Sequence, residues 1–125
     1  MTFLSFVLEI HQPIRLNRAF PLERLSRIAD GNSITDRYFD KKLNEEVFNK
    51  VAGKCYFPTF RILQEIIERS KDWERPFKVS FGLSGPFLEQ VVRYAPELID
   101  LMKKLLQSGN VEILGGTYYH SLSSL

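Results

Sequence analysis

The sequence predicts an α/β fold in which three parallel strands alternate with helices. Three short apolar segments, near residues 2–10, 77–83 and 111–115, have the length and composition of buried strands. Between them, apolar residues recur every three or four positions, as on the buried side of a helix. Strands that alternate with helices favour parallel pairing. The carboxyl ends of such strands meet at one edge of the sheet, where α/β proteins place their sites.

The first predicted strand is almost continuously apolar, which indicates that both of its faces are covered. Alternation along it places Glu9 and His11 on one side of the sheet and Ile10 on the other. Glu9 could orient the imidazole or contact a ligand, or it could form a structural hydrogen bond or ion pair, and these interpretations stay open. The irregular stretch 14–40 follows, with a short helical segment over residues 22–28. A connection of that length is often functional and could form one wall of a cleft.

Two separate helices are expected between the first and second strands. One apolar stripe ends before Gly53, and another begins after Pro58. Cys55 lies between them and is the chain's single cysteine, so no intramolecular disulfide can form. With no histidine near it in sequence, Cys55 is expected to be a small buried hydrophobe rather than a nucleophile.

Two further helices are expected between the second and third strands. The segment Ser84-Gly85-Pro86 suits a helix start, because serine can cap free amides and proline lacks one. Pro96 should interrupt the helical pattern, and Gly109 is a good C-terminal cap for the second helix.

The candidate site lies in the segments that follow the strands. These segments contain both histidines of the chain, one after the first strand and one after the third. A lone histidine there is more often a hydrogen-bonding partner in a turn, but two at equivalent strand ends favour a shared site. Together with amides and phenols they suit a polyhydroxylated ligand such as a sugar better than a phosphate. The predicted substrate-binding residues are His11, Gln12, His120, Tyr119 and Glu9, and Ser84 and Tyr118 are expected to converge on the same edge.

Composition and motifs argue against several other partners. The 17 basic and 15 acidic side chains are spread along the chain, so we expect no nucleic acid partner. We expect neither a membrane segment nor a secretion signal, which makes the cytoplasm the default location. Two histidines and one carboxylate lack the close spacing of a zinc site, and no phosphate-binding glycine loop is present, so we expect no metal and no cofactor.

Two motifs carry a family resemblance. His11-Gln12-Pro13 follows an apolar first strand, and residues 110–122 read NVEILGGTYYHSL. They resemble the first and second conserved regions of glycoside hydrolase family 57, which contains α-amylases, 4-α-glucanotransferases, branching enzymes and amylopullulanases. Residues 38–40, 54–56 and 81–94 are similar to the α-amylase branch.

The resemblance implies an incomplete seven-stranded α/β barrel that acts on α-1,4-glucans or maltooligosaccharides with retention of configuration. Residues 1–125 would be the N-terminal part of this (β/α)7-type barrel. The family's two catalytic carboxylates, on the fourth and seventh strands, lie beyond the point corresponding to Leu125. No catalytic residue is therefore expected in this chain, and the C-terminal part of the barrel would be its partner. By the family's pattern His11 and His120 line the sugar subsite, although the second is not a histidine in every branch.

Two other functions are compatible with the same residues. One is a non-catalytic carbohydrate-binding or interaction domain that uses the same sheet edge. The other is a metal-dependent polysaccharide deacetylase-like enzyme, which should show more histidines and an aspartate pair. In the barrel interpretation, an unpaired strand edge should also promote self-association.

Overall fold

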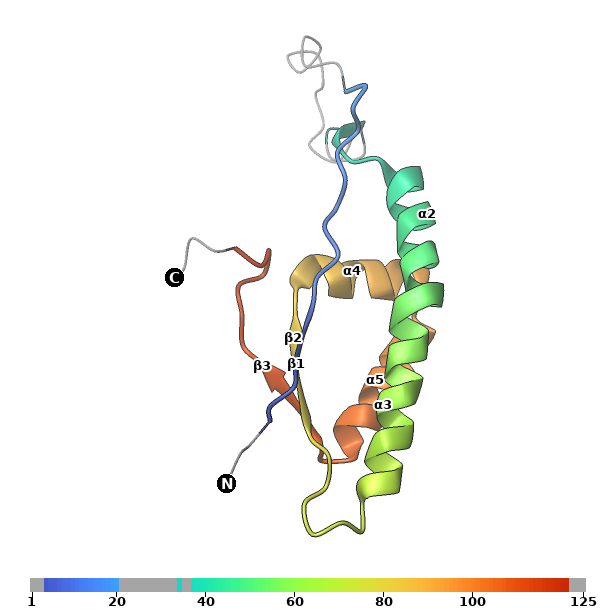
Figure 1. The fold of residues 1–125 in the computed structure, drawn as a ribbon. Helices are drawn as coiled ribbons and strands as arrows, with labels where there is room; N and C mark the ends of the chain where they lie inside the picture. The colour runs from blue at the N-terminus through green and yellow to red at the C-terminus, as the bar shows by residue number, and fades with distance from the viewer. Residues whose placement is uncertain (1–3, 21–33, 35–36, 122–125) are drawn as a thin grey trace.

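The computed structural model describes residues 4–20, 34 and 37–121 (Figure 1). The helical segment expected over residues 22–28 lies outside these ranges. The elements follow one another as strand, helices, strand, helices, strand, as predicted. They are β1 (Val7–Ile10), α2 (Lys41–Val51), the π-helical turn η2 (Ala52–Tyr56), α3 (Phe57–Ser70), β2 (Val79–Leu83), α4 (Gly85–Tyr94), α5 (Glu97–Gln107) and β3 (Val111–Leu114).

The three strands form one sheet in the order β1-β2-β3, and both pairings are parallel. This confirms the predicted sheet, although each strand is shorter than its apolar segment. Gly82 of the central strand is level with Glu9 on one side and with Leu114 on the other. Residues that are level in a parallel sheet point to the same face, so these three positions share a face.

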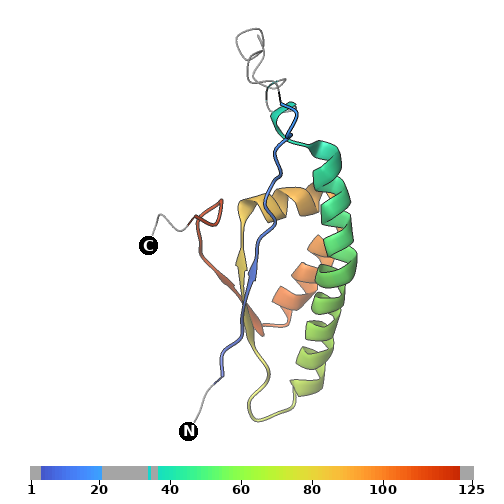
Figure 2. The ribbon, with the colours of Figure 1, turned by 45° about the horizontal axis from the view of Figure 1, so that its top comes forward.

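The helices lie on one side of the sheet in both views (Figures 1 and 2). Chain order equals strand order, so crossovers of the same hand bring both helical connections to that side. The face that carries Glu9 and Gly82 is the opposite one, because Phe81, which alternates with them, is buried among the helices.

The hydrophobic core fills the space between the sheet and the helices. Phe81 of the central strand is 1% exposed and stacks on Phe60 of α3, with 5.7 Å between the ring centroids. The helices contribute further side chains that are fully buried, which are Phe48, Phe87, Val91 and Leu98. Burial of these large apolar groups is the main force that fixes the helices on the sheet.

The expected break between two helices near Gly53 is wrong. Helices α2 and α3 are joined through η2 into one continuous helical segment, in which the Phe57 N–H donates to the Ala52 carbonyl five residues back. This wider turn comes immediately before Pro58, whose ring would clash with the preceding turn of a regular helix. The π-helical turn therefore accommodates a proline that the sequence pattern treats as a helix start.

The expected burial of Cys55 is also wrong, since its side chain is exposed. Ala52 and Tyr56, four residues apart on the helical segment, take the inward positions and are buried. Their neighbour Cys55 is left facing outward.

The predicted helix ends around β2 and β3 are confirmed. Ser84 caps α4, its hydroxyl oxygen accepting a hydrogen bond from the Phe87 N–H. Pro96 separates α4 from α5, and Gly109 follows α5 with a φ of 71°, a left-handed conformation that favours glycine.

Replacing the central aromatic ring tests this account of the core. Phe81→Ala should lower the free energy of unfolding by about 3–5 kcal/mol, because it removes a buried ring and leaves a cavity against Phe60. Urea denaturation measures the change. Ile62→Ala on the exposed side of α3 is the matched control and should cost at most about 0.5 kcal/mol. Equal effects of the two substitutions would contradict the placement of the core.

Candidate functional site

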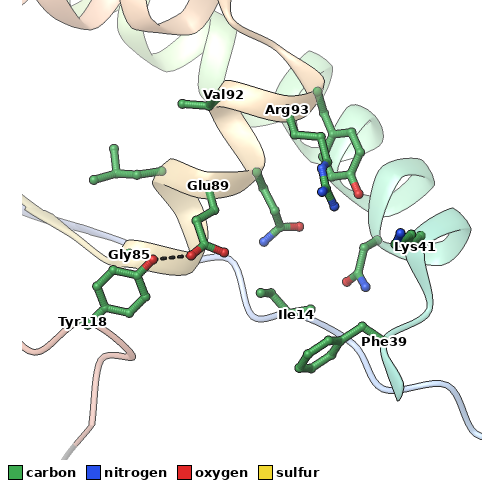
Figure 3. Close-up of a pocket in the computed structure, with 12 residues that line it drawn as sticks. Ile14, Phe39, Lys41, Gly85, Glu89, Val92, Arg93 and Tyr118 are labelled. Carbon is green, nitrogen blue, oxygen red and sulfur yellow. Dashed lines mark hydrogen bonds between the residues drawn. The ribbon is translucent and has the colours of Figure 1, made fainter. Parts of the chain in front are cut away.

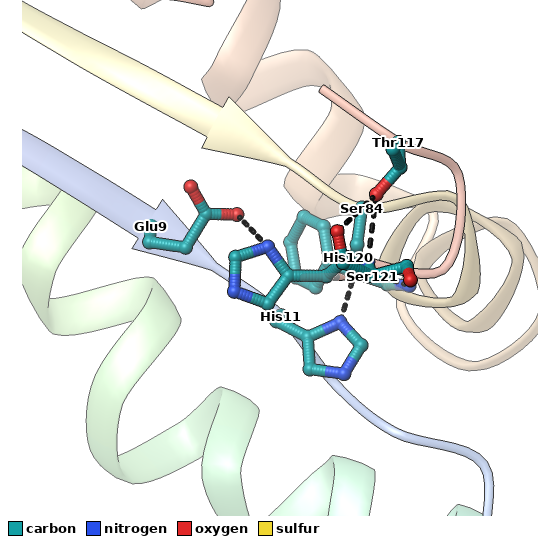
Figure 4. Close-up of polar contacts among 7 residues, drawn as sticks. Glu9, His11, Ser84, Thr117, His120 and Ser121 are labelled. Carbon is teal, nitrogen blue, oxygen red and sulfur yellow. Dashed lines mark hydrogen bonds and ion pairs between the residues drawn. The ribbon is translucent and has the colours of Figure 1, made fainter. Parts of the chain in front are cut away.

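The two histidines lie side by side at the carboxyl end of the sheet (Figure 4). The ring centroids of His11 and His120 are 5.2 Å apart, and the ring planes are inclined by 32°. His11 follows β1 and His120 lies in the segment after β3, so the parallel pairing of both strands with β2 brings them together. The prediction that both would lie on one rim of the sheet is confirmed.

Glu9 contacts His120 rather than His11. Its Oε1 lies 3.2 Å from Nδ1 of His120, and both side chains are 44% exposed. The carboxylate passes over the central strand at Gly82, where an added Cβ would lie 2.0 Å from Glu9 Oε2. Glycine at this position therefore provides the space that the contact needs.

His11 has a different partner. Its Nδ1 lies 2.8 Å from the hydroxyl oxygen of Ser84, the residue that caps α4. Ser84 is 1% exposed, so the imidazole is attached to a rigid, buried point of the fold. Ser84 thus joins the other residues at the site, as the sequence predicts.

A tight turn positions His120. The His120 N–H donates to the Thr117 carbonyl at 3.0 Å, and the Ser121 N–H donates to the Thr117 hydroxyl at 2.7 Å. Within this turn His120 has a φ of 52°, which is uncommon for a residue with a side chain. A second link, from the Gly85 N–H to the Tyr118 carbonyl at 2.7 Å, ties the turn to the start of α4. Such a backbone conformation is often retained at functional sites.

Gln12 is part of a buried network behind the histidines. The side chain is 5% exposed, and its Oε1 accepts a hydrogen bond of 2.9 Å from the Tyr56 hydroxyl. The Gln12 carbonyl accepts a hydrogen bond of 2.7 Å from Gln90 Nε2. Burial raises the pKa of Tyr56 to about 12, so the phenol stays protonated and able to donate. The network fixes the segment after β1, and Tyr56 and Gln90 are members that the sequence pattern did not reveal.

The two tyrosines before His120 have different surroundings. Tyr119 is 71% exposed, and the ring centroids of Tyr118 and Tyr119 are 4.8 Å apart in an edge-to-face arrangement. Tyr118 lies against Gly85, where an added Cβ would be 2.3 Å from its ring. The Tyr118 hydroxyl donates a hydrogen bond to Glu89, which raises the pKa of Tyr118. Tyr119 is therefore the more exposed of the two rings.

A groove of about 770 Å³ adjoins the site (Figure 3). The described part of the long connection contributes Ile14 and Phe39 to it, so this connection does form one wall of a cleft. The remaining lining residues are Lys41, Asn44, Gly85, Leu88, Glu89, Gln90, Val92, Arg93, Tyr94 and Tyr118.

Within residues 4–20, 34 and 37–121, no group of three or more His, Cys, Asp or Glu side chains is arranged to hold a metal ion. Nor does any helix in that part of the chain have the length and apolarity to cross a membrane.

The buried hydroxyl of Tyr56 offers a test of the network. Tyr56→Phe removes the hydroxyl that donates to Gln12 Oε1 and should lower the free energy of unfolding by about 1–3 kcal/mol. Urea denaturation at neutral pH measures this loss. Tyr119→Phe, at an exposed ring, is the control and should change stability by at most about 0.5 kcal/mol.

Tyr56→Phe also tests how the stability contributed by the Tyr56 phenol depends on pH. The Tyr56 pKa is raised from 10.0 to about 12, so the folded protein keeps this proton to higher pH than the unfolded chain does. The associated stability is fully present below pH 10 and is lost as pH rises through about 12. The stability difference between wild type and Tyr56→Phe should therefore shrink over this range. A constant difference would contradict the burial of the phenol.

The sequence of this chain is similar to parts of two larger proteins. A protein of Methanocaldococcus jannaschii, provisionally named an alpha-amylase, is 43% identical over 122 residues. The match covers 98% of this chain and 24% of that protein. The alpha-amylase of Pyrococcus furiosus is 34% identical over 73 residues, which are 58% of this chain and 10% of the enzyme. This chain thus spans about a quarter or less of the length of these relatives.

Structural comparison agrees on the fold. The crystal structure of the 4-alpha-glucanotransferase from Thermococcus litoralis superposes with a TM-score of 0.58 and 24% identity, covering 92% of this chain and 13% of that one. The predicted fold class, a parallel α/β arrangement of the (β/α)7-barrel type, is confirmed. The model of glycosyl hydrolase family 57 matches residues 5–125, which include both histidine segments and the strands β1, β2 and β3. With this match over nearly the whole sequence, the chain belongs to glycosyl hydrolase family 57.

Proposed function

We propose that residues 1–125 form the N-terminal part of a catalytic barrel that acts on α-1,4-glucans or maltooligosaccharides. The observation that carries the proposal is the meeting of His11 and His120, whose ring centroids are 5.2 Å apart at the carboxyl end of the sheet. Family membership and relatives named alpha-amylase and 4-alpha-glucanotransferase support the substrate class. The site would bind one sugar unit of the chain.

The five predicted residues would contribute to sugar binding in different ways. His11 and His120 would hydrogen-bond to sugar hydroxyls, and the exposed ring of Tyr119 would stack on an apolar sugar face. Glu9 would act through His120, whose Nδ1 lies 3.2 Å from its carboxylate. Gln12 would act from the interior, by fixing the segment that carries His11.

Catalysis would need carboxylates from outside residues 1–125. Retaining glycosidases use two carboxyl groups roughly 5–5.5 Å apart, one as nucleophile and one as acid and base. Glu9 lies at the histidine pair, but it is engaged by His120. Among the other carboxylates near this rim, Glu89 is engaged by Tyr118. Hence this chain should bind the glucan without cleaving or transferring it, and further barrel strands would supply the catalytic pair.

Sugar binding is the direct test. Isothermal titration calorimetry with maltotriose should detect binding to the chain. His120→Asn should weaken it about tenfold, equivalent to roughly 1.4 kcal/mol, through loss of the imidazole. Asparagine is chosen because it tolerates the left-handed backbone of this position.

Lys50→Ala, on an exposed part of α2, is the matched control and should bind as the wild type does. An unchanged affinity in His120→Asn would contradict the assignment of the site. Release of reducing ends from maltotriose, abolished by Glu9→Gln, would show that the chemistry lies within this chain after all.

We also propose that the isolated chain associates through its sheet edges. In the described part of the structure, β1 and β3 each pair with a strand on one side only, namely β2. Ile113 of β3 is 42% exposed, and Leu4 and Phe6 before β1 are also exposed. Unpaired apolar edges of this kind promote association with other chains.

Sedimentation velocity at micromolar concentrations should show concentration-dependent association. Ile113→Lys should reduce it, because a lysine on an edge strand opposes strand pairing. Ile62→Lys on α3 introduces the same charge at an exposed site away from the sheet and should not change it. An ideal monomer for the wild type would contradict the edge proposal.

A further inference from the structure

The partners of the two imidazoles determine where their protons lie. Nδ1 of His120 is 3.2 Å from a carboxylate oxygen of Glu9. An ionised carboxylate has no proton to donate and would repel the lone pair of an unprotonated Nδ1, so the proton of this contact belongs to Nδ1 of His120. In the neutral ring the other nitrogen, Nε2, is then an acceptor with a free lone pair.

The contact with Ser84 places the proton of the neutral His11 ring on the other nitrogen, Nε2. The Ser84 hydroxyl oxygen already accepts the Phe87 N–H at the start of α4, at 3.4 Å. The Ser84 hydroxyl also carries a proton. Because Ser84 is only 1% exposed, this proton needs an acceptor within the protein. The contact available is Nδ1 of His11 at 2.8 Å. In the neutral ring His11 then carries its proton on Nε2, which becomes a donor.

From these contacts we propose that the two histidines are held in opposite tautomers, so that the site presents one donor and one acceptor. Each hydroxyl of a sugar can both donate and accept, so sugar hydroxyls can satisfy a ring nitrogen that donates and one that accepts. A fully ionised phosphate only accepts and would leave Nε2 of His120 unsatisfied. The ligand class, a sugar, rests on the proposed function, whereas the tautomers rest on the two contacts alone.

Gly82 and Glu9 are positioning residues in this arrangement. The Glu9 carboxylate reaches His120 across the central strand only because position 82 has no side chain, since a Cβ there would lie 2.0 Å from Glu9 Oε2. Gly82→Ala would therefore displace the carboxylate while leaving every ionisable group of the site in the protein. The contact of His11 with Ser84 does not involve Gly82.

Nitrogen-15 NMR of the sugar-free chain at alkaline pH, where imidazoles are neutral, reads out the tautomers directly. We expect the proton of His11 on Nε2 and that of His120 on Nδ1. The same tautomer in both rings, or a mixture in either one, would overturn the proposal. Because no sugar is present, this result is independent of the proposed function.

The Gly82→Ala variant then tests the role of the carboxylate. We expect the His120 signals to shift toward a mixture of tautomers while those of His11 stay unchanged. Affinity for maltotriose, measured by calorimetry, should fall roughly fivefold, as expected for a weakened hydrogen bond. Gly53→Ala is the matched control, because an added Cβ there meets no atom within 4 Å, and it should change neither readout.

Glu9→Gln provides a second route should Gly82→Ala fold poorly. Its amide can both donate and accept, so His120 should again become a mixture of tautomers while His11 is unaffected. A His120 ring that keeps its Nδ1 proton in both variants would overturn the role of Glu9. If the tautomers are as expected but maltotriose does not bind, the proposed function fails and the tautomer assignment stands.

Discussion

The parallel pairing of β2 with both of its neighbours is the constraint on which the site depends. This pairing sets Glu9 level with Gly82 and Gly82 level with Leu114, so the chain leaves all three strands at the same edge. His11, Ser84 and His120 come from three segments far apart in sequence, and they meet because of it. A change in register by one residue would turn Glu9 toward the helices and separate it from His120.

The two faces of the sheet serve different purposes. The face toward the helices is filled by large apolar side chains such as Phe81 and Phe60, which supply most of the stability. The opposite face carries Glu9 and Gly82 and leads to the histidine pair. The half-exposed side chains of the proposed site are thus held by a rigid layer that lies outside the site.

Sequence reasoning predicted the features that depend on local pattern, and it missed those that depend on contacts between segments. Apolar runs and caps such as Ser84 and Gly109 were sufficient to predict three parallel strands and the common edge of the histidines. The partner of Glu9 could not be predicted, because the contact with His120 depends on the register across β2 and on the space at Gly82. The continuous helical segment through Pro58 was missed for a similar reason, since the π-helical turn is an adjustment specific to that site.

The proposed sugar-binding site is formed by the strand ends around the two imidazoles. A crystal structure of the chain with maltotriose tests it most directly. We expect a glucose unit with hydroxyls within hydrogen-bonding distance of Nε2 of both His11 and His120. A sugar bound only in the groove lined by Phe39 and Val92, without contact to either imidazole, would contradict the proposed site.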